Sequence, residues 1–541
     1  MCWEENIMKL KRKGIAFLLP VALLAASLTG CSFGKGGGGD DEEEAPINQK
    51  PAFEGELERD ENGNIIFDNV EVTMWSIIGD PDLTIHKKLI EKFNDEYAGQ
   101  INIKLVSQAH ADYYPALETT YKNDFESFPD LCFMHNEKTA TYANKRYLFP
   151  LEDSTLQELG FKLDFANVYE NIDRVTKFNG VRFAVPVDAH GFLTNFRTDI
   201  ILKNGLGFEG NTRAIPKSHA EYQELLKKLK DKAAAGQLYI RNITKGQDHA
   251  WKLAGTDWQP SCYQSTDPDG LSALYANGGS MTSADGKTIT FHQNQGFKTY
   301  ITDQVSNWEK GYFTNGTNTE YFPAGNVAMF NEGPWWASMS YDPMYNNSDL
   351  TSVNPTLHVS EEDVEKYSKP YTPMHPDGWW SLDESSPNAH KWYGNGHIMA
   401  LTRHIKDINV AAACVEFMNW YIGGKGTYKI NGTDQQAYHL AYWNSSGHMP
   451  AWKNVYNSEE YHYYKDNNVT LQALGNPEDI IAMESHPYET TVFNAVATCV
   501  ESVHTLMRAG SCTLADVDTK INETVTSAQA ALDMLYEAEE M

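Results

Sequence analysis

The globular part of the chain opens with an alternation of apolar and polar residues. Residues 70–75 alternate in this way and end in Trp75, a period of two that predicts a β-strand. Apolar residues then recur at helical spacing from Ile85 to Tyr97, and Gly99 marks the end of that helix. A second alternating run over 101–105 predicts another strand. This strand–helix–strand order predicts a parallel sheet covered by helices.

Helical and strand patterns continue to alternate along the rest of the chain. Ser218 and Glu221 predict a capping box at the start of a helix that ends at Gly236. The apolar run 398–401 predicts a strand, and a buried helical stripe follows it. Residues 514–535 carry the pattern of one or two final helices. The predicted fold class is therefore α/β, and the globular part is too long for one core, which favours two lobes.

The N-terminal region has the composition of an export signal. Basic residues precede the apolar stretch 15–26, which is too short to span a membrane stably. The stretch is followed by LTGC at 28–31, which resembles the lipobox of bacterial lipoproteins, whose cysteine is lipidated and becomes the new N-terminus. We predict a signal peptide over 1–30 and a lipid-anchored tether over 31–69 that starts at Cys31, because glycine-rich and acidic runs cannot bury a core. The alternative is an ordinary signal peptide that contains a cysteine by chance.

Charge and cysteine content narrow the range of partners. The formal net charge of −29 disfavours nucleic acid, because phosphate binding needs a basic surface. The five cysteines after residue 31 show no CxxC pair and no metal-ligand spacing. Cys499 and Cys512 could pair, although isolated buried thiols are the simpler expectation. We expect no cofactor and no metal ion. No apolar run after the signal is long enough to span a bilayer.

Eight segments, taken in sequence order, resemble one protein family. They are VEVTMWS at 70–76, FPDLCFMHNEKTATYANKRYLFPLED at 128–153, KFNGVRFAVPVDAHGFLTNFRTDIILKNGL at 177–206, IPKSHAEYQELLKKLK at 215–230, ADGKTITFHQNQGFKTYITDQVSNWEKGYF at 284–313, YFPAGNVAMFNEGPWWAS at 321–338, GNGHIMALTRHIKDINVAAACVEFMNWY at 394–421 and NSSGHMPAWKNVY at 444–456. Together they resemble the family 1 extracellular solute-binding proteins, the carbohydrate-binding lipoproteins of bacterial ABC importers, which include the maltose-binding protein. One departure lies at Phe196-Arg197, where the family usually has Tyr-Asn. We expect Arg197 to form an ion pair and transfer no ligand role to it.

The resemblance implies a two-lobed periplasmic-binding-protein-like fold of type II, with the ligand in a cleft between the lobes. The chain would cross between lobes near Asp188, Trp379 and Lys425. The lobes implied in this way are 70–187 plus 379–425 for lobe 1, and 188–378 plus 426–541 for lobe 2. Such a cleft suits ligands because the carboxyl ends of strands face it, and closure around a ligand is a hinge motion.

The candidate ligand site combines aromatic and polar residues. Sugars present apolar C–H faces and hydroxyl rims, so a sugar site needs aromatic platforms together with carboxylates, amides and indole donors. The resemblance places Trp335 on a ligand-stacking position and a hydroxyl-binding acid at the first crossover, beside Asp188 and His190. The candidate ligand-binding residues are Trp75, Asn136, Glu137, Asp188, His190, Glu332, Trp335, Trp336, Trp379 and Trp380. Each has a structural alternative, since tryptophans fill cores and carboxylates cap helices. His135 and His190 are expected to be loop histidines, because no HxH or HExxH spacing accompanies them.

These features favour a binding protein over an enzyme. We expect a monomer, anchored by lipid to the outer face of the bacterial cell membrane, that binds a neutral saccharide and delivers it to ABC transporter permease subunits. One alternative is a secreted glycosidase that uses two carboxylates. Another is the same fold with a peptide, a polyamine or a phosphorylated compound as its ligand. The chain contains no GxSxG and no P-loop motif.

Overall fold

The computed structural model describes most of the globular part of the chain. The described residues are 50, 52–80, 82–244, 246–262, 267–314, 319–334, 366, 372–374, 380–430, 432–466, 468–483 and 485–540. All of them belong to one compact unit, Pro46–Met541. The predicted lipidation residue Cys31 and the candidate residues Trp335, Trp336 and Trp379 lie outside the described residues.

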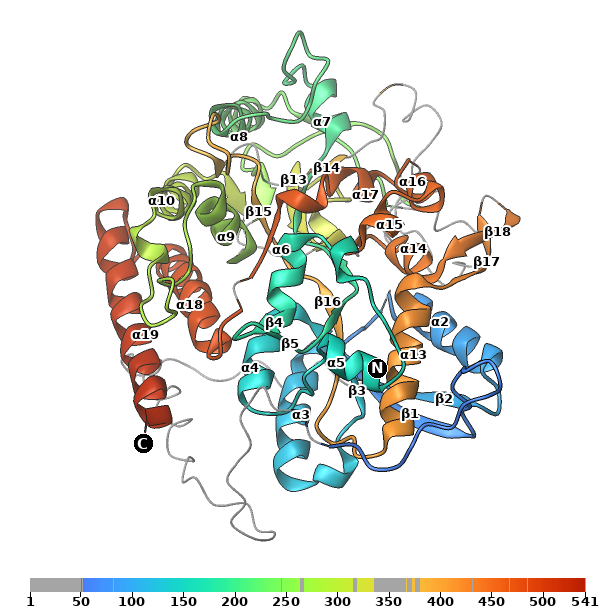
Figure 1. Ribbon diagram of the computed structural model, residues 1–541. Helices are drawn as coiled ribbons and strands as arrows, with labels where there is room; N and C mark the ends of the chain where they lie inside the picture. Colours follow the sequence, from blue (N-terminus) through green and yellow to red (C-terminus); the bar gives the residue numbers. More distant parts are fainter. Residues whose placement is uncertain are drawn as a thin grey trace, which may run out of the picture. The chain divides into compact units, whose positions relative to one another are not determined.

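The fold has two halves, each built around one five-stranded sheet. The sheet of the half that contains β1 (Val70–Ser76), which we call the first half, is seen in Figure 1. Its strands in spatial order are β2 (Ile101–Ser107), β1 (Val70–Ser76), β3 (Leu131–His135), β16 (His397–Leu401) and β6 (Val185–Pro186). Strands β1, β2 and β3 are parallel, which confirms the strand–helix–strand prediction. Strand β16 is antiparallel to both β3 and β6, so the sheet is mixed rather than fully parallel. The chain reaches β16 directly from β15 (Trp392–Gly394), which lies outside this sheet, and not through a covering helix.

The helices that cover this sheet carry the predicted apolar stripes. Helix α2 (Leu83–Glu96) buries Ile85, Leu89 and Phe93, and Gly99 beyond it adopts φ 76°. Helix α13 (Ile408–Gly423) packs beside α2 and β1. The other helices of this half are α3 (His110–Asn123), α4 (Thr139–Asn144), α5 (Asp153–Glu158), α6 (Glu170–Asp173), α14 (His439–Asn444), α15 (Lys453–Tyr456), α16 (Glu459–Asp466) and α17 (Val469–Ala473).

A second five-stranded sheet forms the centre of the other half of the fold. Its spatial order is β12 (Phe313–Thr314), β11 (Ser261–Cys262), β13 (Met329–Glu332), β8 (Leu193–Phe196) and β14 (Thr372–Met374). Strand β8 is antiparallel to both of its neighbours. The helices of this half are α7 (Thr198–Lys203), α8 (His219–Ala234), α9 (Asp267–Ala276), α10 (Gln295–Glu309), α18 (Glu489–Arg508) and α19 (Val517–Glu540).

Helix α8 shows how local sequence sets a helix boundary. The Ser218 hydroxyl accepts a 3.2 Å hydrogen bond from the backbone N–H of Glu221, which is half of the predicted capping box. The Glu221 carboxylate does not return to the Ser218 backbone, because it accepts two 2.9 Å bonds from the guanidinium of Arg213 and one from the Lys217 backbone. The helix ends where predicted, with Gly236 at φ 66°.

Two-stranded ladders accompany the two large sheets. They are β15 (Trp392–Gly394) with β20 (Ile480–Ala482), β17 (Lys425–Ile430) with β18 (Thr433–Tyr438), β7 (Asp188–Ala189) with β19 (Met449–Pro450), β4 (Lys177–Phe178) with β5 (Val181–Arg182), and β9 (Tyr239–Ile240) with β10 (Lys252–Leu253). The five cysteines within the described residues are all buried and unpaired, as expected for isolated thiols.

The buried apolar residues form two main clusters, one for each large sheet. The chain passes from the first cluster to the second between Leu193 and Phe196. It returns to the first cluster between Tyr393 and Ile398. It passes to the second cluster again between Ile480 and Met483, whereas we expected the last passage near Lys425. Residues 426–480 instead pack into the first cluster. The physical reason is aromatic packing on α13, where the rings of His439 and Trp420 stack with centres 3.6 Å apart. Trp380, expected in lobe 1, lies in the second cluster.

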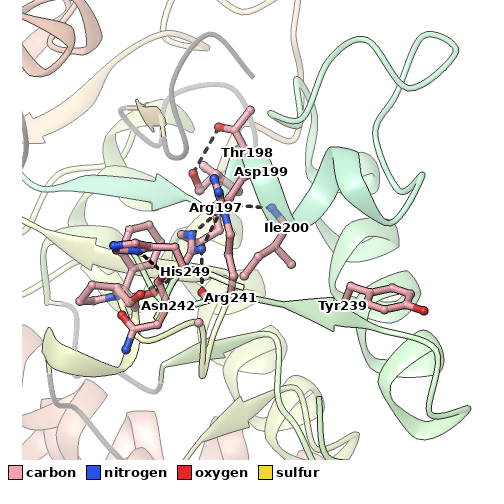
Figure 2. Close-up of polar contacts among 12 residues, drawn as sticks. Arg197, Thr198, Asp199, Ile200, Tyr239, Arg241, Asn242 and His249 are labelled. Carbon is pink, nitrogen blue, oxygen red and sulfur yellow. Dashed lines mark hydrogen bonds and ion pairs between the residues drawn. The ribbon is translucent and has the colours of Figure 1, made fainter. Parts of the chain in front are cut away.

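A buried network of ion pairs and hydrogen bonds holds the start of α7 in place in the second half of the fold (Figure 2). Arg197 donates from Nε and Nη2 to the two carboxylate oxygens of Asp199, both at 2.9 Å. It also donates to the backbone oxygens of Phe322 at 2.8 Å and Arg241 at 3.0 Å. The side chains of Arg197 and Asp199 have no solvent exposure. The expected ion pair of Arg197 is therefore confirmed.

Candidate functional site

Two chain segments cross side by side between the sheets. The first contains β7 and runs to His190, and the second leads from Asn395 into β16. The backbones of His190 and Asn395 exchange hydrogen bonds of 2.8 and 2.6 Å. A Cβ at Gly396 would lie 2.2 Å from the backbone oxygen of Asp188, so this close approach requires glycine. Strand β19 pairs with β7 and adds a third segment to the crossing.

Asp188 lies at the centre of this crossing and is fully buried. Its carboxylate accepts a 2.6 Å hydrogen bond from the indole of Trp443 and a 3.0 Å bond from the backbone N–H of His397. The ring Nδ1 of His397 lies 2.9 Å from the same carboxylate. Burial by itself would raise the pKa of Asp188, but electrostatic interactions with His397 and His448 and hydrogen bonds from His190 and His397 hold that pKa well below its ordinary value. Asp188 is thus an ionised group with several fixed donors.

Histidines surround this carboxylate. His190, His397 and His448 are 5%, 5% and 1% exposed, and their ring centres lie 4.8–5.3 Å apart. The ring of half-buried His135, at the end of β3, lies 5.1 Å from that of His397. Burial lowers the pKa of His190 below its ordinary value, and it lowers the pKa values of His448 and His135 well below that value. These three rings therefore stay neutral at physiological pH.

Two further candidates, Asn136 and Glu137, follow directly after β3. The backbone N–H of Asn136 donates to the oxygen of Gly396 at 2.9 Å, so this turn touches the second crossing segment. The Glu137 side chain is buried, and burial raises its pKa to about 7. One Glu137 oxygen lies 3.6 Å from Nδ1 of His135. The structure thus brings Asn136, Glu137, Asp188 and His190 together around one crossing.

The remaining described candidates lie at other positions. Trp75 is half-buried on β1, and its backbone oxygen accepts a 3.3 Å bond from the Tyr113 hydroxyl. Glu332 is half-buried at the end of β13, opposite Leu193, the first residue of β8. Trp380 is 4% exposed and packs edge to face on Tyr300 in the second core, with ring centres 5.0 Å apart. This placement is that of a core side chain, whereas Trp75 and Glu332 remain partly accessible.

Comparison with known proteins identifies the family of the chain. Residues 88–467 match the family model of the bacterial extracellular solute-binding proteins. The chain belongs to this family. Among the curated proteins, none matches the sequence.

Solved structures of solute-binding proteins share the fold. The GacH receptor of Streptomyces glaucescens, studied unliganded and with acarbose, matches with a TM-score of 0.58 at 13% identity, over 85% of this chain and 99% of that one. An ABC substrate-binding protein from Listeria monocytogenes, in complex with cycloalternan, matches with a TM-score of 0.59 at 14% identity, over 86% of this chain and 100% of that one. The sugar-binding protein MalE from Xanthomonas citri matches with a TM-score of 0.60 at 15% identity, over 87% and 100%.

The likeness confirms the predicted fold class, an α/β fold of the two-lobed binding-protein type. It also confirms the resemblance to solute-binding proteins that the eight segments indicated. The family consists of extracellular binding proteins rather than enzymes. None of the helices within the described ranges is long and apolar enough to cross a bilayer.

Sequence reasoning missed several residues of this solute-binding protein's crossing. His397, His448 and Trp443 contact Asp188 or its neighbours, although they lie more than 200 residues further along the chain. Asp82 also faces the cluster, with one oxygen 3.8 Å from Nε2 of His448. One feature of the sequence pointed to these residues: His135, His190, His397 and His448 each lie beside a strand-like run. No known spacing motif describes this arrangement.

Proposed function

We propose that this chain is a lipid-anchored, extracytoplasmic binding protein that captures a sugar or oligosaccharide between its two lobes and delivers it to an ABC transporter permease. The observation that carries the proposal is the fold match to the solute-binding proteins solved with acarbose and with cycloalternan, and to a cyclic alpha-maltosyl-1,6-maltose binding protein from Arthrobacter globiformis. The match spans more than four-fifths of this chain and nearly all of each relative. Catalysis is not part of the proposal, because the family is one of binding proteins.

The residues at the crossing support a site for polar ligands. Parallel strands β1 and β3 end at Ser76 and His135, and ligands of α/β sheets bind beyond the carboxyl ends of such strands. Asn136 and Glu137 follow β3, and each has a buried oxygen without a hydrogen-bond partner among the described residues. Buried polar atoms normally have partners, so these oxygens suit the hydroxyl groups of a ligand.

The proposed contacts divide into two roles. Trp75, Asn136, Glu137 and Glu332 are proposed to contact the ligand, together with Trp335, Trp336 and Trp379 as aromatic platforms. Asp188 and His190 are proposed as positioning residues, because Asp188 is fully buried and already receives donors from Trp443 and His397. Trp380 is proposed to support the platforms from the core, where it contacts Tyr300.

A ligand panel tests this function. The purified chain is heated with neutral mono- and oligosaccharides, a peptide mixture and polyamines, and binding is then measured by titration calorimetry. A true ligand at a hundredfold excess over its Kd stabilises the folded state by about 3 kcal/mol. We expect a neutral saccharide to raise Tm and to be recovered chemically unchanged. If only a peptide or a polyamine raises Tm, the ligand class is wrong, and if the sugar is cleaved, the protein is an enzyme.

A further inference from the structure

Four buried side chains at the crossing have the composition of a metal site. Asp188, His190, His397 and His448 each offer one ligand atom, and these four atoms lie within 4.8 Å of one another. Their exposed fractions range from 0% to 5%. Three imidazole nitrogens and one carboxylate oxygen form a donor set that suits Zn²⁺, whereas Ca²⁺ and Mg²⁺ prefer oxygen alone.

The spacing of the rings fits a shared ion. The ring centres of His190 and His397 are 4.8 Å apart, those of His190 and His448 are 4.9 Å apart, and those of His397 and His448 are 5.3 Å apart. Imidazoles bound to one tetrahedral Zn²⁺ through bonds of about 2.0–2.1 Å have their ring centres roughly 5 Å apart. The rings therefore need only small shifts to share an ion.

Surrounding groups fix two of the four ligands, His448 and Asp188. Nδ1 of His448 lies 2.9 Å from the Ser446 hydroxyl, whose own hydrogen is donated to the backbone oxygen of Trp443 at 2.9 Å. The hydroxyl oxygen therefore accepts from Nδ1–H of His448, which leaves Nε2 of that ring with its lone pair. Metal-binding histidines commonly have their second nitrogen fixed in this way. Trp443 and the His397 backbone fix the Asp188 carboxylate in the same manner.

We propose that Asp188, His190, His397 and His448 form a four-ligand Zn²⁺ site that ties together the three chain segments at the crossing. The ligands come from β7 and the residue that follows it, from the first residue of β16, and from the residue before β19. A zinc site with four protein ligands is closed to further ligands and therefore structural. The ion would join both crossover segments to the segment that leads into β19. The proposal does not depend on the identity of the transported ligand.

Zinc binding is tested directly on the full chain, purified without a polyhistidine tag and stripped with a chelator. Zinc is titrated in against a chromogenic competitor, and metal content is measured by mass spectrometry. We expect one Zn²⁺ per chain and a rise in Tm with added zinc. His190→Ala and His397→Ala should weaken zinc affinity by about 100-fold or more, and Ser446→Ala by roughly 10–100-fold, as for other outer-shell partners. The matched control is His439→Gln, a buried histidine outside the cluster, which should retain wild-type zinc affinity.

Cobalt gives a readout that needs no variant. Co²⁺ added to the stripped wild-type chain should produce the visible absorption bands of a four-coordinate ion, and zinc should displace it. Circular dichroism establishes that each protein is folded. The proposal is overturned if the folded wild-type chain takes up no stoichiometric zinc, or if the two alanine variants bind zinc as tightly as the wild type. It is also overturned if His439→Gln loses zinc to the same extent as they do.

Discussion

Arg197 forms a bidentate ion pair with the carboxylate of Asp199 inside the second half of the fold. The Nε–Oδ1 and Nη2–Oδ2 distances are both 2.9 Å, and neither side chain is exposed. Nε of Arg241 donates to the same carboxylate at 2.7 Å. Two guanidinium groups thus depend on one buried anion, and the sequence Arg197-Thr198-Asp199 keeps the first pair local.

Asp199→Asn is expected to destabilise the protein strongly. The amide keeps the shape of the side chain but removes the charge, which leaves two buried guanidinium groups uncompensated. Breaking a buried pair in this way costs about 3–5 kcal/mol of unfolding free energy. Urea denaturation of the variant and wild type measures the loss.

The control is Asp231→Asn, which removes an exposed i,i+4 pair with Lys227. Exposed pairs contribute about 0.2–1 kcal/mol, so this variant should lie close to wild type. Equal effects of the two substitutions would show that the Arg197 network does not depend on its charge.

The buried histidine His439 is expected to make the folded protein less stable in mild acid. Burial lowers the pKa of this histidine from 6.5 to about 3, with a smaller contribution from Lys92. Its ring stacks on Trp420 and hydrogen-bonds the Tyr428 hydroxyl at 2.5 Å. The unfolded state binds this proton below pH 6.5 and the folded state does not, so the unfolding free energy falls as pH drops from 6.5 towards 3.

Urea unfolding between about pH 5 and 6.5 tests the contribution of His439. One group with this shift makes the unfolding free energy fall by about 1.4 kcal/mol for each pH unit, once the pH is well below the pKa of the group in the unfolded state. His439→Gln should therefore show a shallower pH dependence than wild type. The exposed histidine His462 provides the control, because His462→Gln should leave the slope unchanged. A slope in His439→Gln as steep as in wild type would contradict the assignment.

Trp335 and Trp380 should respond to alanine substitution in opposite ways. Trp380 lies in the second core, so Trp380→Ala should cost about 3–5 kcal/mol of unfolding free energy. Trp335 is proposed as a ligand platform, so Trp335→Ala should weaken saccharide binding by about tenfold or more and change Tm little. Calorimetry and thermal melting of both variants measure the two effects. Near-normal binding with a large loss of Tm in Trp335→Ala would assign Trp335 to the core.

Cys31→Ala is expected to release the protein from the membrane. The LTGC sequence predicts lipidation of Cys31, and two acyl chains anchor a protein firmly where one is marginal. Fractionation of expressing cells, followed by immunoblotting, locates the protein. Cys2→Ala is the matched control, because Cys2 precedes the basic residues and the apolar stretch of the signal and its loss should leave membrane association intact. Unchanged membrane association of Cys31→Ala would refute the anchor.

Local patterns predicted several elements of this fold. The alternating run at 70–75 became β1, the stripe from Ile85 became α2, and the helix bounded by Ser218 and Gly236 became α8. These features depend on residues close in sequence, because helix and strand periods and caps are local properties. The same holds for the Arg197–Asp199 pair, whose members are two residues apart.

The sequence by itself thus determined the class of the fold, the family, and the approximate bounds of the few elements with a clear periodicity or cap. Only the tertiary structure decided that β16 runs antiparallel to β3, and that residues 426–480 pack into the first cluster. It alone joined Asp188 and His190 to His397 and His448. The physical reason is that strand neighbours and crossovers are selected by packing over the whole chain, and no periodicity within one element records which distant segment will lie beside it.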